Sequence, residues 1–201
     1  MEERSRMNLL TNPSERRAYL REAMEELTWG ESRARIWLNE LPCWEYPATR
    51  VAERRLRASR LRDDTSTCLA VEMAVHTGPM LQYGALGATF LPEQRDDLLV
   101  RVLVSAEPGQ RFPVPLAGPS ETARIGLPEE YIQSLLEDIA QFEELSALGT
   151  GVLSFERALY GEVGSSKRFF QRISHAVVCL LCLKQATLSD QEYVALLRQG
   201  F

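Results

Sequence analysis

Apolar and polar residues alternate with a period of two in several segments of the chain, a pattern typical of half-buried strands. The alternation is regular in residues 68–76 and again in residues 152–160. Residues 98–104, LLVRVLV, are rich in branched aliphatic side chains and give the clearest strand signal in the sequence. A shorter strand is predicted at residues 88–91, and residues 77–84 are predicted to form a turn before it. The middle of the chain therefore predicts a sheet.

Two segments repeat apolar residues at helical spacing, so each is predicted to be a helix with one buried face. The first begins at Pro128, which a first helical turn tolerates, and Glu129 and Glu130 suit the positive end of the helix dipole. The second follows a polar turn in which Ser165 or Ser166 caps the helix. The apolar stripes consist of Ile132, Leu135, Leu136, Ile139 and Phe142 in the first helix, and of Phe169, Phe170, Ile173, Val177, Leu180 and Leu181 in the second.

The N-terminal part of the chain is also predicted to be helical. Asn12 is placed to cap a helix whose apolar stripe continues to Leu27. A shorter helix is predicted through Ile36 and Trp37, ending before Pro42. A third helical stretch is predicted from Ala48 to Arg62.

These elements divide the chain into three parts. Residues 1–65 form an N-terminal helical segment, residues 66–184 form the main α+β domain, and residues 185–201 form a C-terminal helix. The polar residues 63–66 mark the first boundary because they favour a turn. Residues 189–192, SDQE, form a capping box for the last helix.

The composition is that of an ordinary globular protein. Of 201 residues, 45% are apolar and 25% are charged. The apolar run 176–183 is far shorter than the roughly 20 residues that cross a bilayer, and residues 1–10 lack the apolar core of a secretory signal. We therefore expect a cytoplasmic protein with no membrane partner.

The basic residues are unevenly distributed. The formal net charge of −5 argues against a broad nucleic-acid affinity of the whole chain. The predicted helix 48–62 nevertheless carries Arg54, Arg55 and Arg57 among six arginines, against the single acidic residue Glu53. This face either contacts phosphates of ribosomal RNA or is a solvated face that pairs with acidic groups of the protein, and the solvated face is the favoured interpretation.

No pattern of a known catalytic or cofactor site is found. The chain lacks the Gly-Lys-Ser/Thr of a phosphate-binding loop, the Gly-x-Ser-x-Gly elbow and the His-Glu-x-x-His helix. Cys179 and Cys182 lie inside an apolar helix without a second such pair, and only His76 and His175 are available as histidine ligands. Buried thiols are therefore favoured over a zinc or redox site. No catalytic residue, cofactor or metal site is predicted, and the protein is not expected to be an enzyme.

Three short motifs stand in order over about half of the chain. Residues 126–132, GLPEEYI, fit the pattern Gly-x-Pro-x-x-Tyr-Ile. Tyr160, Glu162, Val163, Ser165, Ser166 and Phe170 keep step with a strand ending in Tyr-His-Glu-Val-Asp-Ser-Ser and the helix that follows it. Thr77, Gly78, Gln82, Tyr83 and Gly84 fit Thr-Gly-x-x-x-Gln-Tyr-Gly. Together these motifs resemble domain IV of elongation factor G and of the related ribosome-protection proteins.

The chain also departs from the pattern of that family. Gly161 stands in place of the family's tip histidine, and Gly164 stands in place of the aspartate. Met80 and Leu81 replace the usual Arg-Gly of the earlier turn. These departures put the translocation role of the family in doubt for this chain.

The resemblance implies an α+β fold, a split β-α-β sandwich in which helices cover one face of a mixed sheet. It also implies a left-handed crossover, against the general right-handed preference. The N-terminal helical segment is expected to wrap this domain.

The resemblance further implies a non-catalytic ribosome- or RNA-associated module without GTPase activity. In the family, the tip turn contacts the messenger–transfer RNA complex. The expected RNA-binding residues are therefore Tyr160, Glu162, Ser165, Ser166, Lys167 and Arg168 at the tip, with Arg54, Arg55 and Arg57. The alternative is a partner-binding or self-associating protein of the same fold with no ribosome role, and an enzyme with an unrecognised pocket is a third class.

Overall fold

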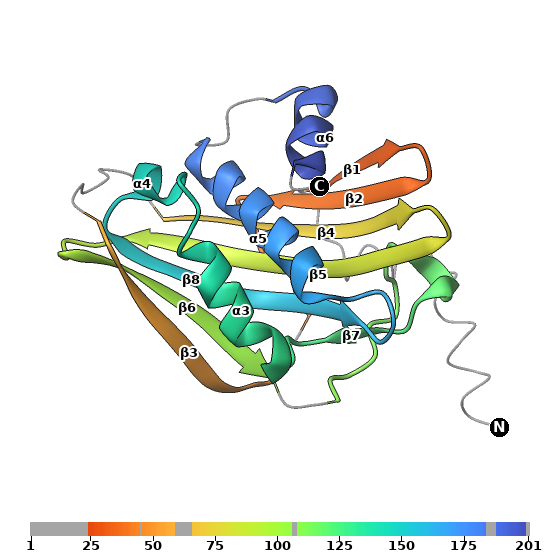
Figure 1. The fold of residues 1–201 in the computed structure, drawn as a ribbon, viewed down its shortest axis with the longest axis horizontal. Coiled ribbons are helices and arrows are strands. Elements are labelled where there is room, and N and C mark those ends of the chain that lie inside the picture. The colour runs from red at the N-terminus through yellow and green to blue at the C-terminus, as the bar shows by residue number, and fades with distance from the viewer. Residues whose placement is uncertain (1–23, 45, 59–65, 106–107, 184–187, 200–201) are drawn as a thin grey trace.

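The computed structural model describes residues 24–44, 46–58, 66–105, 108–183 and 188–199. They form one mixed sheet of eight strands with the α-helices on one face (Figure 1). The strands are β1 (Met24–Trp29), β2 (Ser32–Leu38), β3 (Ala48–Arg57), β4 (Thr67–Thr77), β5 (Met80–Pro92), β6 (Asp97–Ser105), β7 (Ala123–Ile125) and β8 (Gly151–Gly161). The helices are α3 (Glu129–Ile139), α4 (Leu145–Leu148), α5 (Lys167–Cys182) and α6 (Asp190–Arg198), with a 3-10 turn η2 (Gly118–Ser120).

The strand order is β1-β2-β4-β5-β8-β6-β3, and β7 pairs with the end of β8. Neighbouring strands are antiparallel except β6 and β8, which are parallel. In Figure 1, β6 and β8 both point to the right, β8 lies above β6, and the connecting helix α3 lies in front of the sheet. This connection from β6 to β8 is therefore left-handed, whereas most such crossovers are right-handed.

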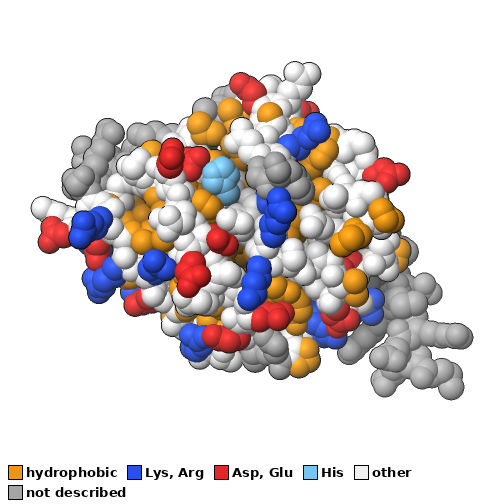
Figure 2. Space-filling view, viewed as in Figure 1, with side chains coloured by type: hydrophobic (Ala, Val, Ile, Leu, Met, Phe, Trp, Pro, Cys, Tyr) orange, Lys and Arg blue, Asp and Glu red, His pale blue; other side chains and the backbone are white. Residues whose placement is uncertain are grey.

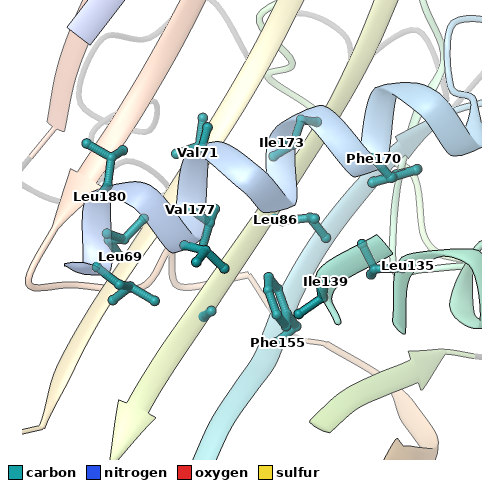
Figure 3. Packing of buried hydrophobic residues seen from close by; sticks show 14 of the residues in the cluster. Leu69, Val71, Leu86, Leu135, Ile139, Phe155, Phe170, Ile173, Val177 and Leu180 are labelled. Carbon is teal, nitrogen blue, oxygen red and sulfur yellow. The ribbon is translucent and has the colours of Figure 1, made fainter. Parts of the chain in front are cut away.

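The main hydrophobic core lies between the sheet and the helices. The apolar stripe of α5 packs over β4 and β5, with Phe170 nearer the start of the helix and Leu180 nearer its end (Figure 3). Leu86 and Phe155 rise from the strands beneath it. The predicted stripe of α5 is buried at all six positions. The first predicted stripe is buried at its four positions within α3, while Phe142 lies beyond the end of α3 and is partly buried. The helix predictions from periodicity are thus confirmed here.

The second face of the sheet has a smaller core of its own. Trp37 on β2 packs edge-on against Trp44, with ring centroids 5.8 Å apart, and Trp44 packs against Phe112 at 5.1 Å. These aromatic residues come from the sheet, the segment 39–44 and the segment 108–122. The two irregular segments therefore cover part of this face.

The predicted N-terminal helices are wrong wherever the structure describes them. Residues 24–29, 32–38 and 48–57 are strands of the same sheet as β4–β8, while most of the helix predicted from Asn12 lies outside the described residues. On β2, Ile36 faces the helices and Trp37 faces the other core, so both faces are apolar and alternation is hidden. The predicted turn 77–84 is also too long, because β4 and β5 form a hairpin in which Thr77 pairs with Met80.

The C-terminal capping box is confirmed. Ser189 Oγ accepts the backbone N–H of Glu192, and the Glu192 carboxylate accepts the backbone N–H of Ser189. This arrangement gives hydrogen-bond acceptors to two backbone N–H groups that have no partner within the helix, and α6 begins at Asp190. None of the helices in the described part of the chain combines the length and apolar character that a membrane span requires.

Candidate functional site

The turn that joins β8 to α5, residues 161–166, is called the tip turn here. It follows the central strand β8, which pairs with β5 on one side and with β6 and β7 on the other. Ser166 caps α5, because its Oγ accepts the backbone N–H of Phe169 at 3.2 Å. The expected cap is therefore confirmed, and Ser166 serves the start of the helix.

A second serine fastens the tip turn to the hairpin strand β5. Ser165 Oγ donates to the backbone oxygen of Tyr83 at 2.7 Å and accepts the backbone N–H of Gly161 at 2.8 Å. The backbone N–H of Tyr83 in turn donates to the oxygen of Gly164 at 3.0 Å. Ser165 thus holds the turn in shape rather than presenting its hydroxyl to a ligand.

Glu121, which the sequence analysis did not single out, fills the inside of the tip turn. Its side chain is buried, and its carboxylate accepts the backbone N–H groups of Val163 at 3.2 Å and Gly164 at 2.5 Å. A Cβ atom at Gly161 or at Gly164 would lie 2.6 Å from the Glu121 carboxyl group, closer than atoms pack. At Gly161 the nearest obstacle to a side chain is thus Glu121, whereas a Cβ atom at Gly164 would also lie 2.8 Å from the backbone oxygen of Leu81.

The outer surface of the tip turn carries an apolar residue between charged ones. Val163 is 89% exposed, and Glu162 pairs with Arg124 of β7. Lys167 and Arg168 are exposed in the first turn of α5, which contains no acidic residue. Tyr160 is different from the other expected tip residues, because it is buried in the main core.

The arginines expected on a helix lie instead on the edge strand β3. Arg55 and Arg57 are exposed on one face of β3, while Arg54 points to the opposite face, where Ala52 and Leu56 pack against the main core. The prediction of one helical arginine face is therefore wrong.

Most charges around β3 are already paired. Arg55 Nη1 lies 2.8 Å from Asp97 Oδ2, and Arg101 Nε lies 2.8 Å from Glu53 Oε1. Asp97 also binds Arg95, and these guanidinium groups hold the pKa of its carboxyl below the usual range. Arg50 pairs with Glu129 of α3. This geometry agrees with the interpretation of these arginines as a solvated face that pairs with acidic groups.

The two groups of expected RNA-binding residues lie at opposite ends of the sheet. Leu56, between Arg55 and Arg57, pairs with Leu98, which pairs with Gly151 at the start of β8. The tip turn begins at Gly161, at the other end of that strand. Ten residue steps along a strand span about 33 Å, so one surface does not contain both groups.

Acidic and basic side chains are interspersed on the face that carries the helices (Figure 2). A line of basic side chains nevertheless crosses this face between α6 and the start of α5. Arg198 of α6 and the nearly buried Arg172 of α5 lie close enough that their charges interact, and burial together with this repulsion lowers the pKa of Arg172 to about 10. Both line an open pocket of about 570 Å³ beside the β1–β2 and β4–β5 turns, with Glu31 as its acidic residue.

A buried polar cluster on the second face has a structural role. Glu72 Oε1 accepts from the Tyr83 hydroxyl at 2.7 Å and from the Leu116 backbone N–H at 2.8 Å. Glu72 Oε2 accepts from Arg35 Nη1 at 3.2 Å, and the same nitrogen donates to the Val114 oxygen at 3.0 Å. Both carboxylate oxygens thus have protein partners, and the cluster fixes the segment 108–122 to the sheet.

Metal-ligating side chains gather at one place among the described residues. The ligand atoms of Glu144, His175 and Cys179 all lie within 4.8 Å of one another, between α4 and α5.

No family model, curated protein or solved structure matches the chain.

Proposed function

We propose that the protein is a non-catalytic RNA-binding module, similar in fold to domain IV of elongation factor G, which contacts ribosomal RNA through its tip turn and the start of α5. The observation that carries the proposal is the placement of Lys167 and Arg168. Both are exposed in the first turn of α5, and within the described part of the chain neither has an ion-pair partner.

Two cations at this position are unfavourable for the helix alone. The start of a helix carries the positive end of its dipole, where a basic side chain costs about 0.3–1 kcal/mol. A phosphate group would offset that cost, because it is attracted by Lys167, Arg168 and the helix end together. The arginines of β3 differ in this respect, since Arg55 already faces Asp97.

The arrangement of the elements supports the likeness in fold. The order β4, β5, β6, β7, α3, α4, β8, α5 is consistent with the split β-α-β unit that the resemblance implies. The connection from β6 to β8 is left-handed, which is the unusual feature of that family (Figure 1).

The tip turn limits the function that we propose. Glu121 occupies the space beside Gly161, so the family's histidine does not fit there without moving a buried carboxylate. The proposed module therefore binds RNA without driving translocation. It also lacks the Gly-Lys-Ser/Thr motif of a phosphate-binding loop, so the proposal includes no GTPase activity.

Cosedimentation of the full chain with ribosomes tests the proposal. The double variant Lys167→Ala, Arg168→Ala should lose binding, and the double variant Arg54→Ala, Arg57→Ala is the matched control that removes the same charge from β3. Binding should weaken steeply between about 50 mM and about 200 mM salt, because phosphate contacts release counterions. Absence of binding at low salt, or equal loss in both variants, would contradict the proposal.

A second candidate is the partner-binding or self-associating protein of the same fold. The observation in its favour is β3, a strand of ten residues that pairs only with β6 among the described strands. Its outer edge offers backbone groups to which a partner could add a strand, and Val51 on it is 49% exposed. A concentration-dependent dimer that the substitution Val51→Lys abolishes, together with no ribosome binding, would favour this candidate.

A further inference from the structure

The group formed by Glu144, His175 and Cys179 connects two elements that are distant in the sequence. Glu144 precedes α4, whereas His175 and Cys179 lie one helical turn apart on α5 and so face the same way. His175 Nε2 lies 3.2 Å from Glu144 Oε1 and 3.6 Å from Cys179 Sγ, which is 3.8 Å from Nδ1. Of the two ring nitrogens of His175, Nε2 is the nearer to Cys179 Sγ, and Nε2 is also the nitrogen that faces Glu144 Oε1.

The two distances from Nε2 suit a tetrahedral zinc ion, whereas the Nδ1–Sγ distance of 3.8 Å means that the imidazole ring has to turn for its Nε2 lone pair to point at the ion. With a Zn–N distance of about 2.05 Å, a Zn–S distance of about 2.3 Å and a Zn–O distance of about 2.0 Å, tetrahedral angles place nitrogen about 3.6 Å from sulfur and about 3.3 Å from oxygen. Imidazole, thiolate and carboxylate together are also a donor set that zinc accepts, whereas magnesium and calcium prefer oxygen ligands alone.

An aromatic ring packs on one side of the group, and the other side is open to solvent. The ring of Phe142 packs edge-on against His175, with ring centroids 5.0 Å apart. Cys179 is 8% exposed, but the side chains of His175 and Glu144 are 24% and 39% exposed. An ion at this position would therefore reach solvent, which can supply a fourth ligand.

Cys182 lies beside the group without belonging to it. Its thiol donates to the backbone oxygen of Glu144 at 3.2 Å, which anchors the same segment to α5 by a hydrogen bond. The pair in the Cys-x-x-Cys motif is thus divided: Cys179 faces the imidazole, and Cys182 faces the backbone.

We propose that Glu144, His175 and Cys179 form a zinc site with water as the fourth ligand, which links the segment before α4 to α5. This site is independent of the proposed RNA contact, because it lies in the second half of α5, away from the tip turn at its start. A bound ion would hold the two elements together and stabilise the folded state by mass action.

The test is zinc binding by the reduced full chain after removal of metal with a chelator. We expect one zinc ion per chain with a dissociation constant below about 1 µM, and a higher melting temperature with zinc than without it. Three single variants should each weaken zinc binding more than about 100-fold, since even outer partners of a ligand contribute about 10- to 100-fold to metal affinity. They are Cys179→Ser, His175→Ala and Glu144→Gln. Circular dichroism without metal establishes that each variant is folded.

Two matched variants and a spectroscopic probe complete the test. Cys182→Ser and His76→Ala should keep zinc affinity, because neither residue is a proposed ligand. Cobalt(II) in place of zinc should give a thiolate charge-transfer band in the wild type and in Cys182→Ser, and no such band in Cys179→Ser. Absence of zinc binding, binding that survives in both Cys179→Ser and His175→Ala, or loss of binding in Cys182→Ser would overturn the proposal.

Discussion

The carboxylate of Glu121 occupies the space beside Gly164 into which any larger residue would project its side chain. The two residues lie 43 positions apart, and Glu121 Oε2 accepts the Gly164 backbone N–H at 2.5 Å. The shape of the tip turn therefore depends on a residue from the connection between β6 and β7. Substitution at either position should affect the other.

Gly164→Asp, which introduces the residue of the family pattern, should destabilise the protein. Its Cβ would meet the Glu121 carboxyl group at 2.6 Å, and overpacking of this kind costs about 1–3 kcal/mol. The double variant Glu121→Ala, Gly164→Asp should lose less stability than the sum of its single variants, because the conflict with Glu121 is then absent and only the contact with the backbone oxygen of Leu81, at 2.8 Å, remains. Urea denaturation of the three variants measures this coupling, and strict additivity would show that the contact is unimportant.

Phe170→Ala should cost about 3–5 kcal/mol in the free energy of unfolding, as truncation of large core residues does. Phe170 is 1% exposed and packs against Tyr131 of α3, with ring centroids 4.9 Å apart. Val163→Ala is the control, since Val163 is 89% exposed and should change stability by less than about 0.5 kcal/mol. A loss below about 1 kcal/mol for Phe170→Ala would mean that this face of α5 is exposed to solvent and not packed in the core.

The salt dependence of ribosome binding should report the number of phosphate contacts. Each contact contributes about 0.7–0.9 to the slope of log affinity against log salt concentration. Removing Lys167 and Arg168 should therefore reduce the slope by about 1.4–1.8, if both contact phosphates. A weaker affinity with an unchanged slope would instead indicate that these residues maintain the shape of the tip turn.

The buried carboxyl group of Glu72 should make stability depend on pH. Burial raises its pKa above the ordinary value of 4.5, against the opposing charge of Arg35. The folded state then holds this proton more tightly than the unfolded state, so the stabilisation is complete below pH 4.5 and is lost as the pH rises through the folded pKa.

Glu72→Gln removes this titration, so it isolates the effect from that of the other carboxyl groups. Relative to the variant, the wild type should lose stability as the pH rises above about 4.5. Urea denaturation at a series of pH values measures the difference between the two proteins. Curves that stay parallel would contradict the expected shift.

Local patterns identified three strands and two helices. Alternation of large apolar residues with small or polar ones identified β4 and β8, and a run of branched aliphatic residues identified β6. The apolar stripes within α3 and α5 are buried as expected. Local signals also sufficed for the caps, since Ser166 and Ser189 act on residues three positions away.

Periodicity did not identify the strands of the N-terminal part. β2 buries Ile36 on one face and Trp37 on the other, so its apolar residues do not alternate with polar ones. β3 is an edge strand with arginine on both faces, and Arg54 is on the face opposite to Arg55. Both patterns resemble a helix when the neighbouring strands are unknown.

Only the part of the candidate site that is contiguous in sequence could be located from the sequence. Lys167 and Arg168 adjoin the tip turn in sequence, so the motif located them directly. Glu121 reaches the turn across more than 40 positions, and Glu144 reaches His175 across 31. No local pattern carries such pairings, because tertiary structure alone brings the residues together.

The position of β3 has a consequence for how the chain acquires its structure. β3 pairs only with β6 among the described strands, and the paired residues are between 40 (Arg57 with Asp97) and 57 positions apart (Ala48 with Ser105). During synthesis β3 therefore has no partner strand until the residues of β6 have also been made. Five of its ten residues are charged, and charged strands resist pairing with the wrong neighbour. We therefore expect the arginines of β3 to keep this strand soluble in the incompletely folded chain, before it pairs with β6.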